Sequence, residues 1–213
     1  QLAVTGDKKL SEEEAELASS IAAQANTHIE NIRLLEETER GRQQLNKRAA
    51  ELETVAKVST AAAAIRDSES LLRSVVDLTN YSFKLYHTSV YLLSEDEDGT
   101  KTLELFAASG KIGQKMLGQG YRIEFNEKIS VIADAARKSE AVIVKDIAND
   151  PLFLAHPLLP DTRSEMAIPM VVADKLIGIF DVESDLPNRF TEEDLQTYST
   201  LASQTAVALQ NAQ

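Results

Sequence analysis

Apolar residues recur every three or four positions along the first third of the chain. They are Ala18, Ile21, Ala25, Ile29 (or His28), Ile32 and Leu35, and then Leu45, Ala49, Leu52, Val55 or Ala56, Ser59 and Ala62. This alternating spacing is typical of a coiled-coil seam. Ser11 and Glu14 form a capping box, and no proline precedes Pro151. The pattern therefore predicts one helix over residues 11–66, about 80 Å long at 1.5 Å per residue.

The apolar seam is interrupted between Leu35 and Leu45, where every residue is polar, charged or glycine. Gly41 lies within this stretch and costs a helix about 1 kcal/mol relative to alanine. Two interpretations stay open. The stretch is either a solvated part of the helix or a soft joint where a twist or register shift passes between domains.

A single helix of this length would expose its apolar stripe to water, and pairing with a second copy would bury it. We therefore expect a parallel homodimer formed through the helices. The expected interface residues are Ile21, Ile32, Leu35, Leu45, Leu52 and Leu201.

From Asp67 onward the periodicity changes to that of short helices and strands. The expected elements are a helix over 71–83 capped by Asp67 or Ser68, strands over 85–94 and 102–108 joined by an acidic turn at 95–99, a loop or short helix over 111–120, a strand or extended loop over 121–125, a helix over 130–138, a strand over 141–144, an irregular loop over 149–160, a hairpin of 164–173 and 175–183 turning at Ala173-Asp174, and a helix from Thr191 to the end. This order predicts an α+β fold with a mostly antiparallel sheet and helices on one face.

Two residues of the hairpin carry specific expectations. Pro169 lacks a backbone donor and is expected at a strand start or at an edge of the sheet. Gly178 stands inside an apolar strand, which indicates a bulge or a close approach of another backbone.

The chain also repeats itself, because residues 9–32 align without a gap to residues 189–212. The identical pairs are Glu12/Glu192, Glu13/Glu193, Ser19/Ser199, Ala22/Ala202, Gln24/Gln204 and Asn31/Asn211. Two copies of one domain ending indicate a tandem array. The expected organisation is the end of a preceding domain over 1–35, a helical coiled-coil linker over 36–66, a domain core over 67–190, and a closing helix over 191–213 that leads to a downstream domain.

Composition narrows the possible partners. The net charge of −12 opposes binding to nucleic acid, which relies on basic side chains to neutralise phosphates. No run of 18 apolar residues is present, so we expect no membrane insertion in this fragment. The chain has no cysteine, which excludes disulfides and fits a cytoplasmic location.

The segment from Arg163 to Ser184 resembles the closing hairpin of a GAF domain. It carries the apolar-proline pair Ile168-Pro169, a polar turn, the pair Ile177-Gly178, and a strand that ends at a serine. Phe190–Asp194 is similar to the start of the closing helix of the family, and segments 89–94, 103–110 and 144–151 resemble its opening strands and the stretch before its ligand loop. The resemblance covers residues 55–213.

The resemblance implies a sensory or regulatory module, since members bind cyclic nucleotides, tetrapyrroles, haem, small metabolites or nothing. A covalent bilin is excluded because it needs a cysteine, and so is the cysteine-based sulfoxide reductase activity of the family. The cyclic-nucleotide pattern is broken, because Leu195 replaces its final glutamate and Glu127 separates Asn126 from Lys128. Haem would need an axial histidine. The cofactor therefore stays unknown.

The candidate ligand-binding residues are Tyr91, Phe125, Phe153, His156 and Arg163. By resemblance, His156 lies in the loop that borders a GAF pocket, although a solvated or structural histidine remains the alternative. Arg163 would meet an anionic ligand or form a surface salt bridge, and the aromatic residues would line a cavity or fill the core. Of the other histidines, His28 is expected on the helix seam and His87 at the surface.

No catalytic motif or metal site is found in the sequence, so we expect no enzyme activity in this fragment. The resulting hypothesis is a sensory GAF module that passes a signal through long dimeric helices to an output domain, in a two-component sensor resembling a histidine kinase. The alternative is a structural dimerising spacer with a vestigial pocket and no ligand.

Overall fold

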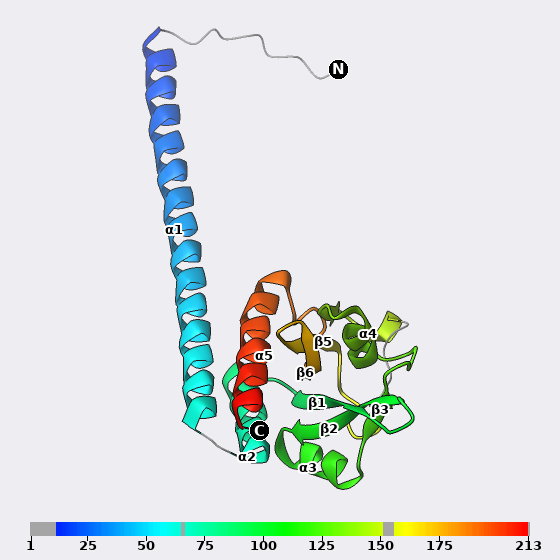
Figure 1. Ribbon diagram of the computed structural model, residues 1–213. Coiled ribbons are helices and arrows are strands. Elements are labelled where there is room, and N and C mark those ends of the chain that lie inside the picture. Colours follow the sequence, from blue (N-terminus) through cyan, green and yellow to red (C-terminus); the bar gives the residue numbers. More distant parts are fainter. Residues whose placement is uncertain (1–11, 65–66, 151–155, 213) are drawn as a thin grey trace, which may run out of the picture. The chain divides into compact units, whose positions relative to one another are not determined.

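The computed structural model describes residues 12–64, 67–150 and 156–212 and forms two compact units, residues 1–50 and residues 51–213 (Figure 1). The first unit contains most of helix α1 (Glu12–Ala64). The predicted long helix is therefore confirmed over 53 residues. The predicted cap at Ser11 lies outside the described residues.

The second unit contains a six-stranded sheet in the order β3-β2-β1-β6-β5-β4, in which all neighbouring strands are antiparallel. The strands are β1 (His87–Glu95), β2 (Lys101–Ala108), β3 (Arg122–Glu124), β4 (Val142–Val144), β5 (Ser164–Val172) and β6 (Lys175–Ser184). The helices are α2 (Ser68–Phe83), α3 (Gly110–Gly118), α4 (Val131–Lys138), the 3-10 turn η1 (Ile147–Asn149) and α5 (Glu192–Ala212). The open choices over 111–120 and 121–125 are thus decided as a helix and a short strand.

Helices cover both faces of the sheet, and not one face as the sequence predicted. Helices α2 and α5 contact each other and pack on one face, whereas α3 and α4 pack on the other (Figure 1). Successive side chains of a strand point to opposite faces. On β5, Met166 and Ile168 therefore join the core under α2 and α5, while Ala167 joins the core under α3 and α4.

The helix starts follow the predicted capping chemistry. A side-chain oxygen of Asp67 accepts a hydrogen bond from the Ser70 amide at 2.8 Å and so begins α2. At α5, the Thr191 hydroxyl accepts from the Asp194 amide at 3.2 Å, and the Asp194 carboxylate accepts from the Thr191 amide at 3.0 Å. This reciprocal pair is a capping box, which confirms the predicted start of the last helix.

Pro169 and Gly178 occupy the special positions that the sequence indicated. Pro169 lies opposite Ile179 of β6, beyond the point where β4 stops pairing with β5 at Ala167. Pro169 thus lies inside β5 and not at its start, on a stretch of the strand that β4 does not pair with. Gly178 faces the backbone of Tyr91, and a Cβ there would lie 2.1 Å from the Tyr91 carbonyl oxygen.

The last turns of α1 belong to the second unit. Val55 and Val58 are buried in the same core as α2 and α5, although the sequence placed them in a linker that ends at residue 66. Leu45 and Leu52 are 70% and 69% exposed. The core of the domain thus reaches back into the segment predicted as a linker.

Leu201 is 1% exposed and lies in the core of its own domain. This corrects the prediction that Leu201 lies at a dimer interface, because the apolar face of α5 covers the sheet. The other expected interface residues, Ile21, Ile32 and Leu35, are exposed on α1. None of the described helices is long and apolar enough to cross a bilayer.

Candidate functional site

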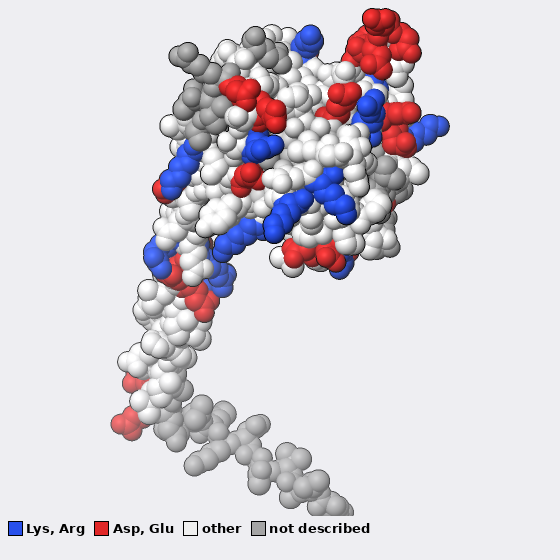
Figure 2. Space-filling view, turned by 90° about the horizontal axis from the view of Figure 1, so that it is seen from below, with Lys and Arg blue, Asp and Glu red and all other residues white. Residues whose placement is uncertain are grey.

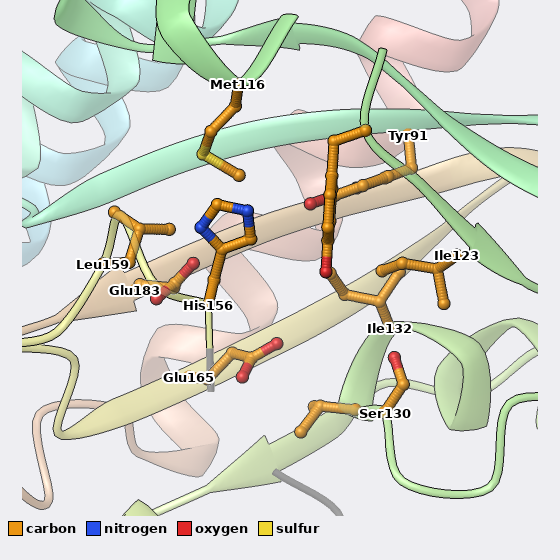
Figure 3. Close-up of a pocket in the computed structure, with 11 residues that line it drawn as sticks. Tyr91, Met116, Ile123, Ser130, Ile132, His156, Leu159, Glu165 and Glu183 are labelled. Carbon is orange, nitrogen blue, oxygen red and sulfur yellow. The ribbon is translucent and has the colours of Figure 1, made fainter. Parts of the chain in front are cut away.

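A small cavity lies on the face of the sheet that α3 and α4 cover (Figure 3). Its lining comprises Tyr91, Met116, Tyr121, Ile123, Ser130, Val131, Ile132, His156, Leu159, Glu165 and Glu183. The open space is about 30 Å³, which holds roughly two water molecules. Six of the eleven lining residues are polar, and three of these, Tyr91, Glu165 and Glu183, lie on strands.

The register of the strands builds an acidic floor beneath this cavity. Glu165 of β5 lies opposite Glu183 of β6, and Ala167 lies opposite Asp181. Residues opposite each other in an antiparallel pair point to the same face, as do residues two apart along a strand. The side chains of Glu165, Asp181 and Glu183 therefore share one face, and all three are buried.

Burial is the main reason that the pKa values of these carboxyl groups are raised. It raises the pKa of Glu165 and of Asp181 well above the usual range, and the repulsion among the three groups raises these two pKa values further. Burial also raises the pKa of Glu183 to about 7, although the Thr162 hydroxyl donates a hydrogen bond to Glu183 and opposes the shift.

Asp181 occupies the centre of the acidic floor. Its Oδ2 accepts a hydrogen bond from the Ser89 hydroxyl at 3.0 Å. The nearby carboxyl group of Glu165 also affects its pKa. Its Oδ1 is buried and has no hydrogen-bond partner among the described residues.

Aromatic rings form the wall above the acidic floor. The rings of Tyr121 and His156 meet edge to face with their centroids 4.5 Å apart, and the Tyr91 and Tyr121 centroids are 6.4 Å apart. His156 Nδ1 accepts a hydrogen bond from the Leu158 amide at 3.1 Å, which places the proton of the neutral ring on Nε2. Burial lowers the pKa of His156. The wall is therefore uncharged at neutral pH.

His87 is 2% exposed, which corrects the expectation that it lies at the surface. It begins β1 opposite Glu183, on the same face as the cavity. Burial lowers the pKa of His87 to about 4, with a smaller contribution from His156. Its Nδ1 lies 3.5 Å from the Ser109 hydroxyl, and its Nε2 has no hydrogen-bond partner among the described residues.

The structure brings together two of the five predicted site residues. Tyr91 and His156 both line the cavity. Phe125 packs against the same core without lining the cavity, and Phe153 lies outside the described residues. Arg163 forms an ion pair with Asp146 at 3.3 Å, which is the salt bridge that the sequence left as its alternative role.

The sequence missed Glu165, Glu183, Tyr121 and Met116. The signal for the two glutamates was only weak, since each stands next to a serine at one end of an otherwise mostly apolar strand. The arrangement can accept hydrogen bonds, stabilise a positive charge and contact a small apolar group. Within the described part of the chain, no cluster of three or more histidine or acidic side chains is arranged to hold a metal ion.

The fold and the cavity define the class of protein, a small α+β domain with a polar pocket on one face of an antiparallel sheet. The chain belongs to the GAF domain family, whose model matches residues 66–210. This match confirms the resemblance drawn from the closing hairpin. A search of curated protein sequences finds no match.

Solved structures share this fold at low sequence identity. A free methionine-R-sulfoxide reductase from Neisseria meningitidis, in complex with its substrate, is 22% identical with a TM-score of 0.67, over 78% of this chain and 92% of that chain. The GAF domain of a phosphoenolpyruvate-protein phosphotransferase from Coxiella burnetii is 22% identical with a TM-score of 0.67, over 77% and 95%. Residues 122 to 287 of a methyl-accepting chemotaxis protein are 18% identical with a TM-score of 0.60, over 73% and 96%.

Proposed function

We propose that this chain is a sensory GAF module that passes a signal through long dimeric helices to an output domain, in a signalling protein of the sensor histidine kinase type. The single observation that carries the proposal is the shared sheet. Strands β1, β5 and β6 line the cavity with one set of side chains and contact the helix core with the other.

Adjacent residues of β5 illustrate this double role. Glu165 lines the cavity, and the next residue, Met166, is buried in the core that also contains Val55 and Val58 of α1. A ligand that changes the position of β5 therefore changes the packing surface for the end of α1. It shifts the helices only to the extent that it binds the two arrangements with different affinity.

The surface of α1 supports a homodimer. The apolar side chains of the seam are exposed, and a second parallel copy would bury them. They are Ile21, Ile32, Leu35, Leu45 and Leu52. Residues 12–32 of the first repeated segment lie in α1, and residues 192–212 of the second make up α5, which supports a tandem array of such domains.

Disulfide cross-linking tests the proposal cleanly because the chain has no cysteine of its own. Leu35→Cys and Leu45→Cys place thiols on the seam, and Glu37→Cys and Gln43→Cys place matched thiols two residues away, on the opposite side of the helix. We expect the seam variants to cross-link between copies and the controls not to do so. In the parent protein, a stimulus that alters output should change the rate at the seam positions. A monomer at high concentration, or cross-linking that no stimulus changes, would contradict the proposal.

A second candidate function is a dimerising spacer with a vestigial pocket. The size of the cavity favours it, because 30 Å³ is far below the roughly 300–1,000 Å³ of ordinary ligand pockets. Native mass spectrometry of freshly purified protein separates the two functions, since a small molecule that co-purifies would refute the spacer.

We propose that the chain itself is not an enzyme. The Neisseria relative is a reductase, and the cysteine-based chemistry of such proteins needs a thiol that this chain lacks. An assay for reduction of free methionine sulfoxide by the purified chain tests this, and turnover above the buffer control would overturn it.

A further inference from the structure

Within the described parts of the chain, the three buried carboxyl groups of the cavity floor lack the ion pairs that acidic side chains make elsewhere in this domain. On the surface, acidic and basic side chains are interspersed (Figure 2), and pairs such as Lys101–Glu95 form at 3.6 Å. Among the described residues, neither Glu165 nor Glu183 is in an ion pair, and no lysine or arginine lines the cavity. The residues that the structure describes therefore do not compensate the negative charge that this floor can develop.

Such a cluster destabilises an empty site. Ionised carboxyl groups that are buried together repel one another, and apolar residues of similar volume often give a more stable protein. Two further polar atoms of the same face are buried without a hydrogen-bond partner among the described residues. They are Oδ1 of Asp181, a residue that is 0% exposed, and Nε2 of His87. A group that supplies positive charge and hydrogen-bond donors would complete this floor.

The walls of the cavity select the kind of cation. The rings of Tyr91, Tyr121 and His156 offer faces and edges to an organic cation, and rings of this type attract ammonium groups. Met116, Ile123 and Ile132 offer an apolar surface for an alkyl stem. An inorganic divalent cation instead requires about six oxygen ligands, whereas only two carboxyl groups line this space.

We infer that the cavity binds the ammonium group of a small organic amine, held between the carboxyl groups of Glu165 and Glu183 and covered by the rings of Tyr121 and His156. Figure 3 shows the two carboxyl groups on one side of the cavity, with the His156 ring between them and Met116. This inference rests on the proposed ligand-binding function and names the chemical class of the ligand.

The amine replaces a proton of the floor. With no ligand, burial raises the pKa of Glu183 to about 7, and an adjacent ammonium group would lower that pKa. Binding at neutral pH therefore releases a proton, and the affinity rises as the pH increases through about 7. The other titratable groups that act on this floor are Asp181, Asp150, Tyr91, Tyr121, His87 and His156, none of which is cationic at neutral pH.

The methionines provide a direct assay, because the chain has three of them. Met116 lines the cavity, whereas Met166 and Met170 lie in the core on the opposite face. We propose titrating protein labelled with 13C at the methionine methyl groups with ethylammonium chloride, and in parallel with ethanol and with sodium propionate. A probe this small is limited to a dissociation constant on the order of millimolar.

We expect ethylammonium to shift the Met116 methyl signal saturably, with a larger effect than on Met166 or Met170. Glu183→Gln should weaken binding at least about tenfold, since it removes the charge that contacts the ammonium group. Glu165→Gln should weaken binding less, because it replaces a carboxyl group whose pKa is raised well above the usual range by a neutral amide. Glu104→Gln is the matched control, because Glu104 is an exposed residue of the same sheet. The methionine signals also report whether each variant is folded.

Two outcomes would overturn the inference. If propionate or ethanol shifts Met116 as strongly as ethylammonium, the site binds another class of ligand, and the proposed sensory function survives. If no probe shifts Met116, the amine inference fails, and native mass spectrometry of the purified protein then decides the sensory function separately.

Discussion

The carbonyl oxygen of Tyr91 fills the space that a side chain on Gly178 would occupy. A Cβ at Gly178 would lie 2.1 Å from that oxygen and 3.1 Å from the Cα of Leu92. Both contacts are with backbone atoms, which cannot rotate away as a side chain can. The close approach of β1 and β6 beside the cavity therefore depends on a glycine at this position.

Gly178→Ala should destabilise the domain by about 2–4 kcal/mol, because β1 and β6 must move apart. Gly118→Ala is the matched control, since a Cβ at the end of α3 meets nothing within 4 Å. Alanine there should stabilise the helix by up to about 1 kcal/mol. Urea unfolding at a constant slope measures both changes. Equal midpoints for the two variants would contradict the close approach.

The buried end of α1 gives a second prediction. Val58→Ala should lower the free energy of unfolding by about 2 kcal/mol, because it removes methyl groups from the domain core. Leu52→Ala, two turns earlier on an exposed position, should change it by less than about 0.5 kcal/mol under conditions where the chain is monomeric. A neutral Val58→Ala would show that α1 is dispensable for the fold of the domain.

The raised pKa of Glu183 predicts that the protein becomes less stable as the pH rises through about 7. The pKa of Glu183 rises from 4.5 to about 7 on folding, so the folded state binds more protons than the unfolded state between these values. The contribution of Glu183 to stability is therefore fully present below about pH 4.5 and is lost as the pH rises through about 7. Glu183→Gln removes this loss and should raise the free energy of unfolding by about 1–3 kcal/mol at about pH 8.

The pH dependence of Glu183→Gln can be checked with urea midpoints at several pH values. Near pH 4.5 the variant and the wild type should differ much less than at about pH 8, because the carboxyl group is then protonated in the folded protein. Glu104→Gln should leave the profile unchanged, since Glu104 is exposed. A wild-type protein that is as stable at about pH 8 as Glu183→Gln would argue against a protonated Glu183.

The titration of His87 makes the stability depend on pH in the opposite direction to Glu183. The pKa of His87 falls from 6.5 to about 4 on folding, so the unfolded state binds more protons in this range. The contribution of His87 is present above about pH 6.5 and is lost as the pH falls through about 4. As the pH falls from about 7 to about 4, the free energy of unfolding of His87→Gln should therefore decrease by about 2–3 kcal/mol less than that of the wild type. Parallel losses in the two proteins would mean that His87 is solvated.

The elements of the fold could be predicted because each has a local signal. The turn at Ala173-Asp174 has both residues at positive φ, 47° and 62°, as a two-residue hairpin requires. The start of α5 could be predicted from the spacing of Thr191 and Asp194 alone. Such signals involve residues close in sequence, and they do not depend on how the elements pack.

The cavity could be predicted only in part because its residues meet through strand pairing. Glu165 and Glu183 are brought together by the β5–β6 register, and His87 is brought to the same face by pairing of β1 with β6. The turn alone does not give the β5–β6 register, because an irregularity between Met170 and Val171 shifts the pairing by one residue. The β1–β6 pairing joins segments that are distant in the sequence. Because histidine is polar, the sequence suggested a surface position for His87. Its burial follows from the pairing of β1 with β6.

The role of an apolar helix stripe also could not be assigned from sequence. Val55 and Leu201 continue patterns of the kind that Leu45 follows, yet both are buried in their own domain while Leu45 is exposed. A stripe that packs on a sheet and a stripe that pairs with another helix have nearly the same period. Only the tertiary structure distinguishes them.

Strand alternation leaves a single layer of backbone between the acidic floor and the helices. Glu165 and Met166 are joined by one peptide bond, as are Asp181 and Val182, and the members of each pair lie in different cores. A peptide plane cannot tilt toward one side without carrying its neighbouring residue with it. Substitutions on β5 or β6 that change ligand binding by moving the backbone at the cavity are therefore expected to change the packing of α2 and α5 on the sheet as well.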